Sequence, residues 1–340
     1  MTYISNNKKL KDINILFLAH YAPKDEYETI PHSIHDKVYA EYHHEIFHVL
    51  KKHFPCILST SNTDILLKKN INVDYIFSLY NRMNFRNSEI FISTVAEYKK
   101  IPYLGSPPNI RALAEDKHLS KMLAYRLNVP TPKWNIYNVN SSVCRPNFKG
   151  PYFVKPRFGA ASKFIDEDSI CSSWEKAKNR IRFLHEHNMD AILEEQIDGI
   201  YHTSPVLRNF GKPLLLPVIE QLSNHKGNVV TYHQKRKIES GLNRNIVKNN
   251  AIQNQIQYFS KLLFSQVQPL DYTRFDYIID RKSNIPYFLE FNVCCNLGSQ
   301  STIYQSAQSL GITYEDLVMN ILYSSLFRQG LIKSTMGNQL

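Results

Sequence analysis

Short apolar runs alternate with amphipathic stretches over the first hundred residues of the chain. Apolar runs of this length predict buried strands, whereas apolar residues spaced three and four apart predict helices that cover a sheet. The runs that predict strands are 13–20, 56–60 and 74–80, and the stretches with helical spacing are 37–54 and 88–100. Strands that alternate with helices are typical of a parallel α/β domain, and the turn-forming segment 105–108 marks its end.

Beyond that boundary the pattern changes to groups of strands with helices between them, which is typical of an α+β arrangement. Residues 151–165 predict a strand, a loop of small residues and a return strand. Asp198 and Gly199 mark a second boundary, so we expect three domains, at 1–107, 108–198 and 199–340. The other predicted helices are 109–129, 174–187, 252–267, 300–309 and 313–328, and the other predicted strands are 131–139, 191–197, 272–280 and 285–293.

The composition, with 43% apolar and 21% charged residues among 340, is typical of a globular protein with sizeable cores. No apolar run is long enough to cross a bilayer, and the N-terminus has no apolar segment behind its lysines. We therefore expect a soluble cytoplasmic protein. Five cysteines, none of them in a C-x-x-C pair, predict reduced thiols rather than disulfides or a structural zinc site.

The formal net charge of +11 arises from 41 Lys and Arg against 30 Asp and Glu. Nucleic-acid binding needs such charges to be clustered, but here they are spread along the chain, with one concentration at 233–237. No helix-turn-helix, zinc-finger or RNP motif accompanies them. We therefore do not expect a nucleic-acid partner, and attraction of a small anionic substrate explains the surplus equally well.

The most informative chemistry lies on two predicted strands that are joined by a turn centred near Ser283. Side chains alternate between faces along a strand, so Arg274 shares a face with Asp276. Glu290 likewise shares a face of the partner strand with Asn292. Asp276 and Glu290 are equidistant from Ser283. The same holds for Arg274 and Asn292, so both pairs are predicted to be cross-strand neighbours.

This cluster suits a metal-bound nucleotide. Two carboxylates and one amide provide the hard oxygen ligands that Mg²⁺ prefers, and a neighbouring arginine suits phosphate. The alternative is an ordinary solvated face held by a salt bridge. The sequence has neither a G-x-G-x-x-G nor a G-x-x-x-x-G-K-[ST] motif, so other residues have to hold a nucleotide. Lys155, at a strand end, and the small-residue loop 159–162 can offer a charge and backbone N–H groups to phosphates.

Taken in order, several motifs resemble the ATP-grasp superfamily, and within it the D-alanine:D-alanine ligase branch. They are GSPPNIRALAEDKHLSKMLAYRLNVPTPKW, FVKPRFGAAS, ILEEQIDG, TRFDYIID followed by YFLEFN, and Ser301 before AQSLGITYEDLV, all between residues 103 and 328. The resemblance implies the ATP-grasp fold, with α/β and α+β parts. It makes 1–107 a Rossmann-like substrate domain, 108–198 the central subdomain, and 199–340 the C-terminal subdomain with the metal and catalytic residues.

The resemblance also implies roles for individual residues. The residues matched to ATP binding are Lys117, Lys155 and Ser162 at the phosphates, and Glu194, Glu195, Ile197 and Leu289 at the adenine. Those matched to metal binding are Asp276, Glu290 and Asn292, with Glu290 bridging two Mg²⁺ ions, for which Mn²⁺ is an alternative. Those matched to catalysis are Arg274 at the phosphate and the tetrahedral intermediate, Lys235 at the γ-phosphate, and Ser301 at the carboxylate of the second substrate.

The implied reaction is an ATP-dependent ligation that forms an amide bond between two small amino-acid-like substrates. A carboxylate attacks the γ-phosphate of ATP to give an acyl phosphate, which an amine then attacks. Such catalysis depends on positioning and charge neutralisation, so no protein nucleophile is needed. Two alternatives stay open: a ligase for a different acid or peptide in a biosynthetic pathway, and a protein that binds nucleotide without ligating. The resemblance also suggests a homodimer.

Some positions depart from the usual pattern of the family. Lys163 and Phe164 stand where a second glycine usually follows in the phosphate loop. Tyr201 stands where a glutamate commonly holds the ribose, and Asn296 replaces a common glycine. These differences leave the nucleotide chemistry in place and leave the substrates open. The candidates for a glutamate that holds the ammonium group of the first amino acid are Glu26 and Glu28.

His44, Glu45 and His48 spell H-E-x-x-H, the helix motif of zinc peptidases, and give a zinc hydrolase as a distant alternative. The predicted helix around them carries an apolar stripe, and the two histidines lie on roughly its opposite face by helical rotation. A solvent-facing pair on the first helix of an α/β domain favours a chance match.

Overall fold

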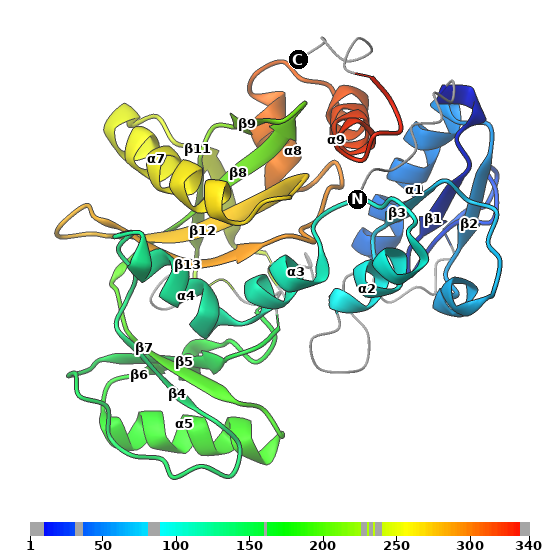
Figure 1. Cartoon of the computed structure of the whole chain (residues 1–340). Coiled ribbons are helices and arrows are strands. Elements are labelled where there is room, and N and C mark those ends of the chain that lie inside the picture. Colours follow the sequence, from blue (N-terminus) through cyan, green and yellow to red (C-terminus); the bar gives the residue numbers. More distant parts are fainter. Residues whose placement is uncertain are drawn as a thin grey trace.

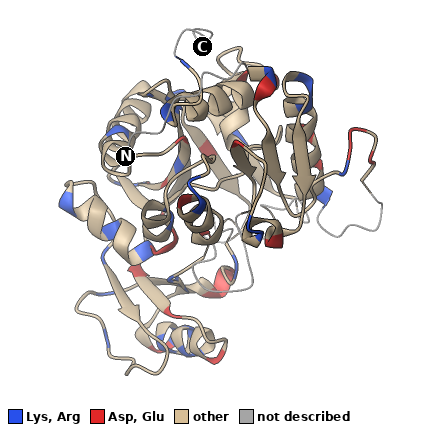
Figure 2. Cartoon of the chain, turned by 45° about the vertical axis from the view of Figure 1, so that its right-hand side comes forward, with Lys and Arg blue, Asp and Glu red and all other residues tan. Residues whose placement is uncertain are grey.

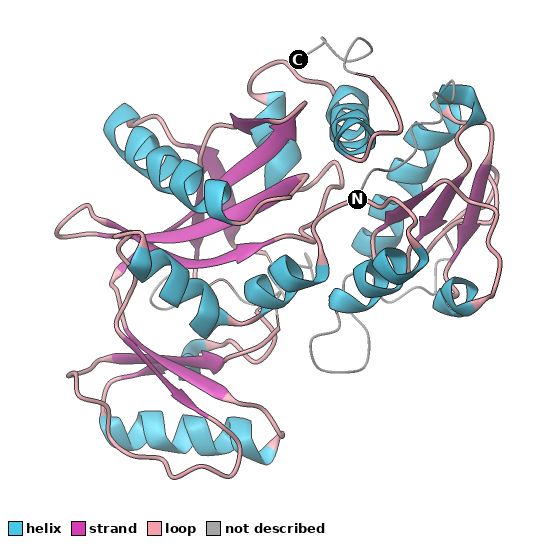
Figure 3. Cartoon of the chain, viewed as in Figure 1, coloured by secondary structure: helices cyan, strands magenta, loops and turns pink. Residues whose placement is uncertain are grey.

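The protein consists of three sheets with helices packed around them (Figure 1). The computed structural model describes residues 10–30, 37–80, 89–159, 162–225, 230, 234 and 240–333. Figure 3 shows helices packed against and between the sheets, with the smallest sheet at the right, a twisted four-stranded sheet at the bottom and the largest sheet above it. The pattern of strands and helices expected from the sequence is largely confirmed by these elements.

The N-terminal sheet is parallel, as the alternation of strands and helices predicted. Its strands are β1 (Ile15–Leu18), β2 (Ile57–Thr60) and β3 (Tyr75–Ser78), in the order β2-β1-β3, and its helices are α1 (Lys37–His53) and α2 (Ile90–Lys99). Every residue of β1 and β3 is buried, because helices cover both faces. Alternate residues of β1 accordingly belong to two cores: Ile15 and Phe17 to one, Leu16 and Leu18 to the other.

The central sheet is antiparallel. Its strands are β4 (Trp134–Tyr137), β5 (Tyr152–Pro156), β6 (Ile170–Cys171) and β7 (Ala191–Glu195), in the order β4-β7-β5-β6, with α5 (Trp174–Glu186) packed on β5 and β7. The prediction of a return strand within 151–165 is wrong. The residues from Ser162 to Ile165 form turns, and pairing with β5 begins only at Ile170. Ser162 and Phe164 have positive φ angles, which a strand does not allow.

The C-terminal sheet has six strands and carries most of the polar residues singled out by the sequence. The strands are β8 (Gly199–Asn209), β9 (Lys212–Leu215), β10 (Ile219–Ser223), β11 (Leu242–Ile246), β12 (Tyr272–Asp280) and β13 (Pro286–Asn292). They follow the order β11-β10-β8-β12-β13, with β9 paired to β8. The helices are α7 (Asn250–Gln266), α8 (Thr302–Gln308) and α9 (Tyr314–Arg328). Leu263 and Phe264 of α7 pack in the core beneath β12 and β13.

The helical stretch expected over 109–129 is two helices, α3 (Pro108–Glu115) and α4 (Lys117–Arg126). Asp116 separates them: its backbone is extended, and its carboxylate accepts a hydrogen bond from the His118 N–H (2.9 Å) as the N-cap of α4. The apolar residues of α3 and α4 share a core with β12 and β13. The domain limits at 107 and 198 stay a prediction, but residues 108–129 pack with the C-terminal sheet.

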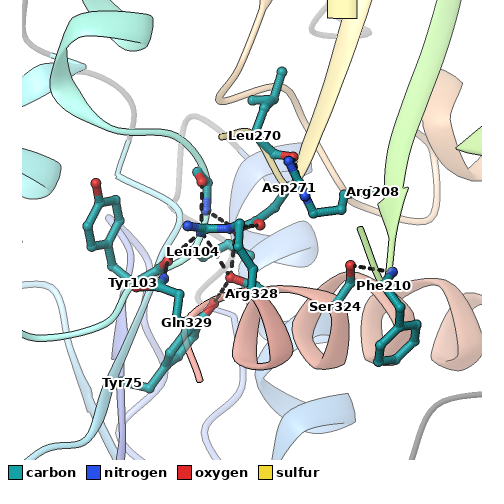
Figure 4. Close-up of polar contacts among 12 residues, drawn as sticks. Tyr75, Tyr103, Leu104, Arg208, Phe210, Leu270, Asp271, Ser324, Arg328 and Gln329 are labelled. Atoms are coloured by element: carbon teal, nitrogen blue, oxygen red, sulfur yellow. Dashed lines mark hydrogen bonds and ion pairs between the residues drawn. The ribbon is translucent and has the colours of Figure 1, made fainter. Parts of the chain in front are cut away.

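A buried ion pair joins the N-terminal sheet to the C-terminal part of the chain (Figure 4). Asp271 is fully buried and accepts hydrogen bonds from Arg328 Nε (2.7 Å) and Nη2 (2.9 Å). It also accepts from the Gly105 N–H (2.7 Å) and from Ser325 Oγ (2.6 Å). The Tyr75 hydroxyl of β3 donates to Ser325 Oγ (2.7 Å). One carboxylate therefore fixes the interdomain connection, α9 and β3 together.

We expect Asp271→Asn to lower the free energy of unfolding by about 3–5 kcal/mol, because removing the charge leaves Arg328, whose side chain is only 17% exposed, without its anionic partner. The asparagine has nearly the same volume, but its amide nitrogen cannot accept from the donors that surround it. Urea unfolding followed by far-ultraviolet circular dichroism gives the measurement. Asp168→Asn, at an exposed residue, is the matched control. Equal unfolding midpoints for D271N and the control would contradict the role of Asp271.

Candidate active site

A pocket lies between the central sheet and the C-terminal sheet, which face each other below and above it in Figure 1. Strands β5 and β7 contribute one wall, and β8, β10, β12 and β13 contribute the other. Eight of the residues predicted from the sequence line this pocket: Lys155, Ser162, Glu194, Glu195, Ile197, Asp276, Leu289 and Glu290. Residues that are far apart in the sequence therefore converge on one cavity between two rigid sheets.

The β12–β13 hairpin places its polar residues opposite one another, as the sequence predicted. Asp276 pairs with Glu290, and Arg274 pairs with Asn292. Nearer the turn, however, the register differs by one residue, because Tyr277 pairs with Phe288. Leu289 is therefore the extra, unpaired residue of a β-bulge. If the register near the turn continued without a bulge, Asp276 would lie opposite Leu289 instead of Glu290.

The bulge also changes which side chains face the pocket. In a regular strand Leu289 and Glu290 would point to opposite faces, but both line the pocket. On the other face, Phe288 and Phe291 both belong to the apolar core although they are three residues apart. The bulge therefore allows one strand to offer an apolar side chain and a carboxylate to the same cavity.

Asp276 is the centre of a polar network on this face. Its carboxylate accepts from Arg274 Nε and Nη2 (both 2.9 Å), Thr203 Oγ1 (2.9 Å) and Asn292 Nδ2 (3.2 Å). Thr203 in turn accepts from Gln221 Nε2 (2.8 Å). Burial disfavours the charge of Arg274, but the facing Asp276 carboxylate outweighs it and raises the pKa of the guanidinium. The sequence did not single out Thr203 or Gln221, since neither carries a charge or belongs to a motif.

The donor set on this face suits a hard cation. Among the described residues, His, Cys, Asp and Glu side chains alone do not form a group of three or more that could hold a metal ion. A cation here would instead use two carboxylates and an amide oxygen, from Asp276, Glu290 and Asn292, which the register brings side by side.

A buried lysine–glutamate–lysine cluster forms the opposite wall. Glu194 lies 3.1 Å from Lys121 Nζ and 3.0 Å from Lys155 Nζ, and all three side chains are buried. Burial favours the neutral carboxyl, but the two lysines hold the pKa of Glu194 below its ordinary value. Burial lowers the pKa of Lys121 to about 8, although Glu194 opposes the change. Lys121 was not predicted from the sequence, although it follows Lys117 by one helical turn and so shares its face of α4.

Lys117 connects the two walls of the site. Its Nζ lies 3.7 Å from Glu290 Oε2 and donates to the Gly159 carbonyl (2.6 Å) in the loop after β5. Its pKa is lowered by burial, with Glu290 acting in the opposite direction. Arg157 strengthens this junction through a bidentate ion pair with Asp116, at 3.0 and 2.6 Å. Lys117 is therefore held between the loop after β5 and the carboxylate of Glu290.

Of the remaining predicted residues, those that the structure describes are not among the residues that line the pocket. Ser301 is buried and is the N-cap of α8, with its Oγ accepting from the Tyr304 N–H (3.1 Å). Lys235 lies outside the residues that the structure describes. Glu26 is exposed, with its carboxylate 4.0 Å from Lys51 Nζ, and the carboxylate of Glu28 accepts from the Lys24 N–H.

Two departures from the family pattern have a local structural reason. Tyr201, at the position where the family commonly has a glutamate that holds the ribose, lines the pocket. Burial, together with the charge of Glu194, raises the pKa of the Tyr201 hydroxyl. Asn296 accepts a hydrogen bond from the Gly298 N–H (2.7 Å) and so shapes the loop after β13.

The H-E-x-x-H motif does not form a metal site. His48 Nδ1 lies 2.7 Å from the His44 carbonyl oxygen, and its Nε2 lies 3.1 Å from the carbonyl oxygen of Glu26. The Glu45 carboxylate accepts from the backbone N–H (2.9 Å) and the hydroxyl (2.6 Å) of Ser299. All three residues therefore take part in hydrogen-bond contacts within the protein, and Glu45 connects α1 to the loop before Ser301.

Lys and Arg are spread along the described part of the chain rather than concentrated in one segment. Figure 2 shows Lys and Arg interspersed with Asp and Glu over all three sheets. The basic segment 233–237 lies outside the described residues except for Gln234. Within the described part of the chain, no helix is both long and apolar enough to cross a membrane.

Comparison with known proteins agrees with this geometry. The profile of the family "D-ala D-ala ligase C-terminus" matches residues 131–323. The D-alanine–D-alanine ligase of Carboxydothermus hydrogenoformans is 28% identical over 277 residues, covering 76% of this chain and 83% of the relative. The D-alanine–D-alanine ligase of Nitrosomonas eutropha is 26% identical over 229 residues, covering 66% of this chain and 72% of the relative.

A crystal structure of the D-alanine–D-alanine ligase from Bacillus anthracis complexed with ATP has a TM-score of 0.72 with this protein. It is 18% identical and covers 93% of this chain and 98% of its own. The expected ATP-grasp fold is thereby confirmed, and the zinc-hydrolase alternative is wrong. Because the family profile covers more than half of the chain, the protein belongs to the D-alanine–D-alanine ligase family of ATP-dependent ligases, which form a peptide bond.

Proposed function

We propose that this protein joins two small amino-acid-like substrates in an ATP-dependent reaction through an acyl phosphate, with D-alanine as the first substrate to test. The observation that carries the proposal is the bulged hairpin, which pairs Arg274 with Asn292 and Asp276 with Glu290, the latter two lining the pocket. Family membership supports the same chemistry. We also propose a cytoplasmic location, where ATP and free amino acids occur, and the homodimer stays a prediction.

For the nucleotide, we propose that its base lies between the two sheets. Leu289 and Ile197 are apolar residues of the pocket, and the backbone at Glu195 follows the buried Glu194 on the same strand. Lys155, Ser162 and Lys117 lie on or beside the loop after β5, where phosphates can accept from backbone and side-chain N–H groups. Lys235 is proposed to approach the γ-phosphate on the strength of the resemblance alone.

For the metal, we propose Mg²⁺ held by Asp276, Glu290 and Asn292, with two ions and with Mn²⁺ as an alternative. When bound, the cation neutralises charge on the transferred phosphoryl group. Arg274 is held by Asp276 in one orientation, so its guanidinium is preorganised for charge that develops at the reacting carbonyl and phosphate. Ser301, at the start of α8, is proposed to contact the second substrate.

The function is tested with a panel of D- and L-amino acids, ATP and Mg²⁺. We expect phosphate release that depends on an amino acid, a dipeptide by mass spectrometry and ADP as the nucleotide product. Hydroxylamine should trap the acyl phosphate as a hydroxamate. ATP binding without amino-acid-dependent turnover would favour the non-ligating alternative. AMP formation, or a phosphorylated alcohol or amine, would contradict the mechanism.

Glu290→Gln should lower turnover at least about a hundredfold, because it removes the charge of a metal-type ligand while keeping its volume. The variant should remain folded by circular dichroism. Glu175→Gln, on the exposed face of α5, is the matched control and should keep full activity. Near wild-type turnover by the folded E290Q protein would remove Glu290 from the site.

Lys155→Ala should weaken ATP binding about 10- to 100-fold, because a charge-assisted hydrogen bond to phosphate is lost. Lys155→Met keeps the apolar stem and serves as a second variant if the alanine variant is unstable. Isothermal titration calorimetry with ATP gives the affinity, and Lys176→Ala on the surface of α5 is the control. An unchanged dissociation constant in both Lys155 variants would show that this lysine does not bind the nucleotide.

A further inference from the structure

Arg244 has no role in the nucleotide site described above, yet it lies on the same face of the C-terminal sheet. It belongs to the edge strand β11, where it pairs with Gln221 of β10. Gln221 pairs in turn with Tyr201 of β8, and both of these residues line the pocket. Directly opposite residues in an antiparallel sheet point to the same face. Arg244 therefore faces the same side as the pocket.

The guanidinium of Arg244 is only partly satisfied by the described residues. Its Nη1 donates to the Gln300 carbonyl (3.2 Å), while its Nε is buried and has no acceptor among them. No carboxylate of the described residues forms an ion pair with it, in contrast to the bidentate pair between Arg274 and Asp276. Burial and the nearby charge of Arg274 lower the pKa of Arg244 to about 10.

Arg244 is half-buried, and its buried Nε needs an accepting partner, because a charged donor that is removed from water without an acceptor is unfavourable. An anion is the strongest acceptor for a guanidinium. Arg274 cannot supply that partner, since it is itself positive and its own donors face Asp276. The guanidinium of Arg244 can still donate through Nε and a terminal nitrogen, which is the arrangement that binds a carboxylate through two hydrogen bonds. The surroundings thus select an anion that comes from outside the described residues.

We propose that Arg244 binds a carboxylate of the amine-donating substrate and so selects an anionic acceptor. This inference rests on the proposed ligase function. Arg244 lies at the opposite edge of the sheet from Glu290, because β11 is one edge strand and β13 is the other. Arg244 also contacts Gln300, which directly precedes Ser301, the residue proposed to contact the second substrate.

The carboxylate can be the α-carboxylate of the amine substrate or a carboxylate on its side chain, and a competition experiment distinguishes the two. In the first arm, the enzyme receives ATP, Mg²⁺, D-alanine and an equal concentration of D-alaninamide. The two amines compete for the same acyl phosphate, and mass spectrometry gives the ratio of D-alanyl-D-alanine to its amide. In the second arm, D-glutamate and D-glutamine compete as acceptors. If the amino-acid panel identifies another acid donor, it replaces D-alanine in both arms.

In one of the two arms, we expect Arg244→Gln to lower the ratio of the product from the carboxylate acceptor to the product from the amide acceptor about tenfold or more. The substitution removes the charge but keeps a donor for the Gln300 carbonyl. Arg244→Lys should keep part of the preference. Arg182→Gln, at an exposed residue of α5, is the control and should leave both ratios unchanged. A product ratio does not depend on how much active enzyme is present, so partial unfolding of a variant cannot imitate the effect.

Three outcomes would overturn the inference. If the folded wild-type enzyme joins no acceptor to the acid donor, the proposed ligase function is wrong, and the proposed role of Arg244 is wrong with it. If products form but Arg244→Gln leaves both ratios unchanged, only the role of Arg244 fails. If the variant raises the KM for ATP while both ratios stay unchanged, Arg244 binds a phosphate instead of the acceptor.

Discussion

The pairing of β12 with β13, including its one-residue bulge, is the constraint on which the polar face of the pocket depends. The bulge at Leu289 shifts the register so that Glu290 lies opposite Asp276. On the core side, the same shift directs Phe288 and Phe291 into a single apolar cluster. Burial of those aromatic rings therefore stabilises the strand arrangement that gathers the polar residues. Stability and chemistry are coupled through one irregularity in one strand.

Several buried charges of the described residues are compensated in pairs or triplets that connect elements distant in the sequence. Glu194 lies between Lys121 and Lys155, which brings α4 and β5 against β7. Such clusters depend on every member, since removing one partner leaves another charge buried. Arg244 differs, because the described residues offer its guanidinium only the Gln300 carbonyl. That difference separates a residue that holds the fold from one suited to an external anion.

The N-terminal sheet is attached to the rest of the protein by both apolar and polar contacts. Leu322 of α9 shares a core with Phe17 of the N-terminal sheet. Asp271 then fixes the polar side of the same junction through Arg328 (Figure 4). Glu45 of α1 extends the contact to the loop that leads to Ser301. The N-terminal elements and the loop before Ser301 are therefore held in one arrangement.

The sequence by itself determined most strands and helices, because burial periodicity and capping residues are local properties. It also determined the polar hairpin, whose alternation and turn lie within about twenty residues. It could not reveal the bulge at Leu289, since counting from the turn gave the correct pairs without showing the change of face. Lys121 and Arg244 were equally hidden, because a lysine or arginine at the surface and one buried at a site look alike in a sequence. Only tertiary packing, which brings the two sheets together and removes water, decided which charges are buried and which groups face them.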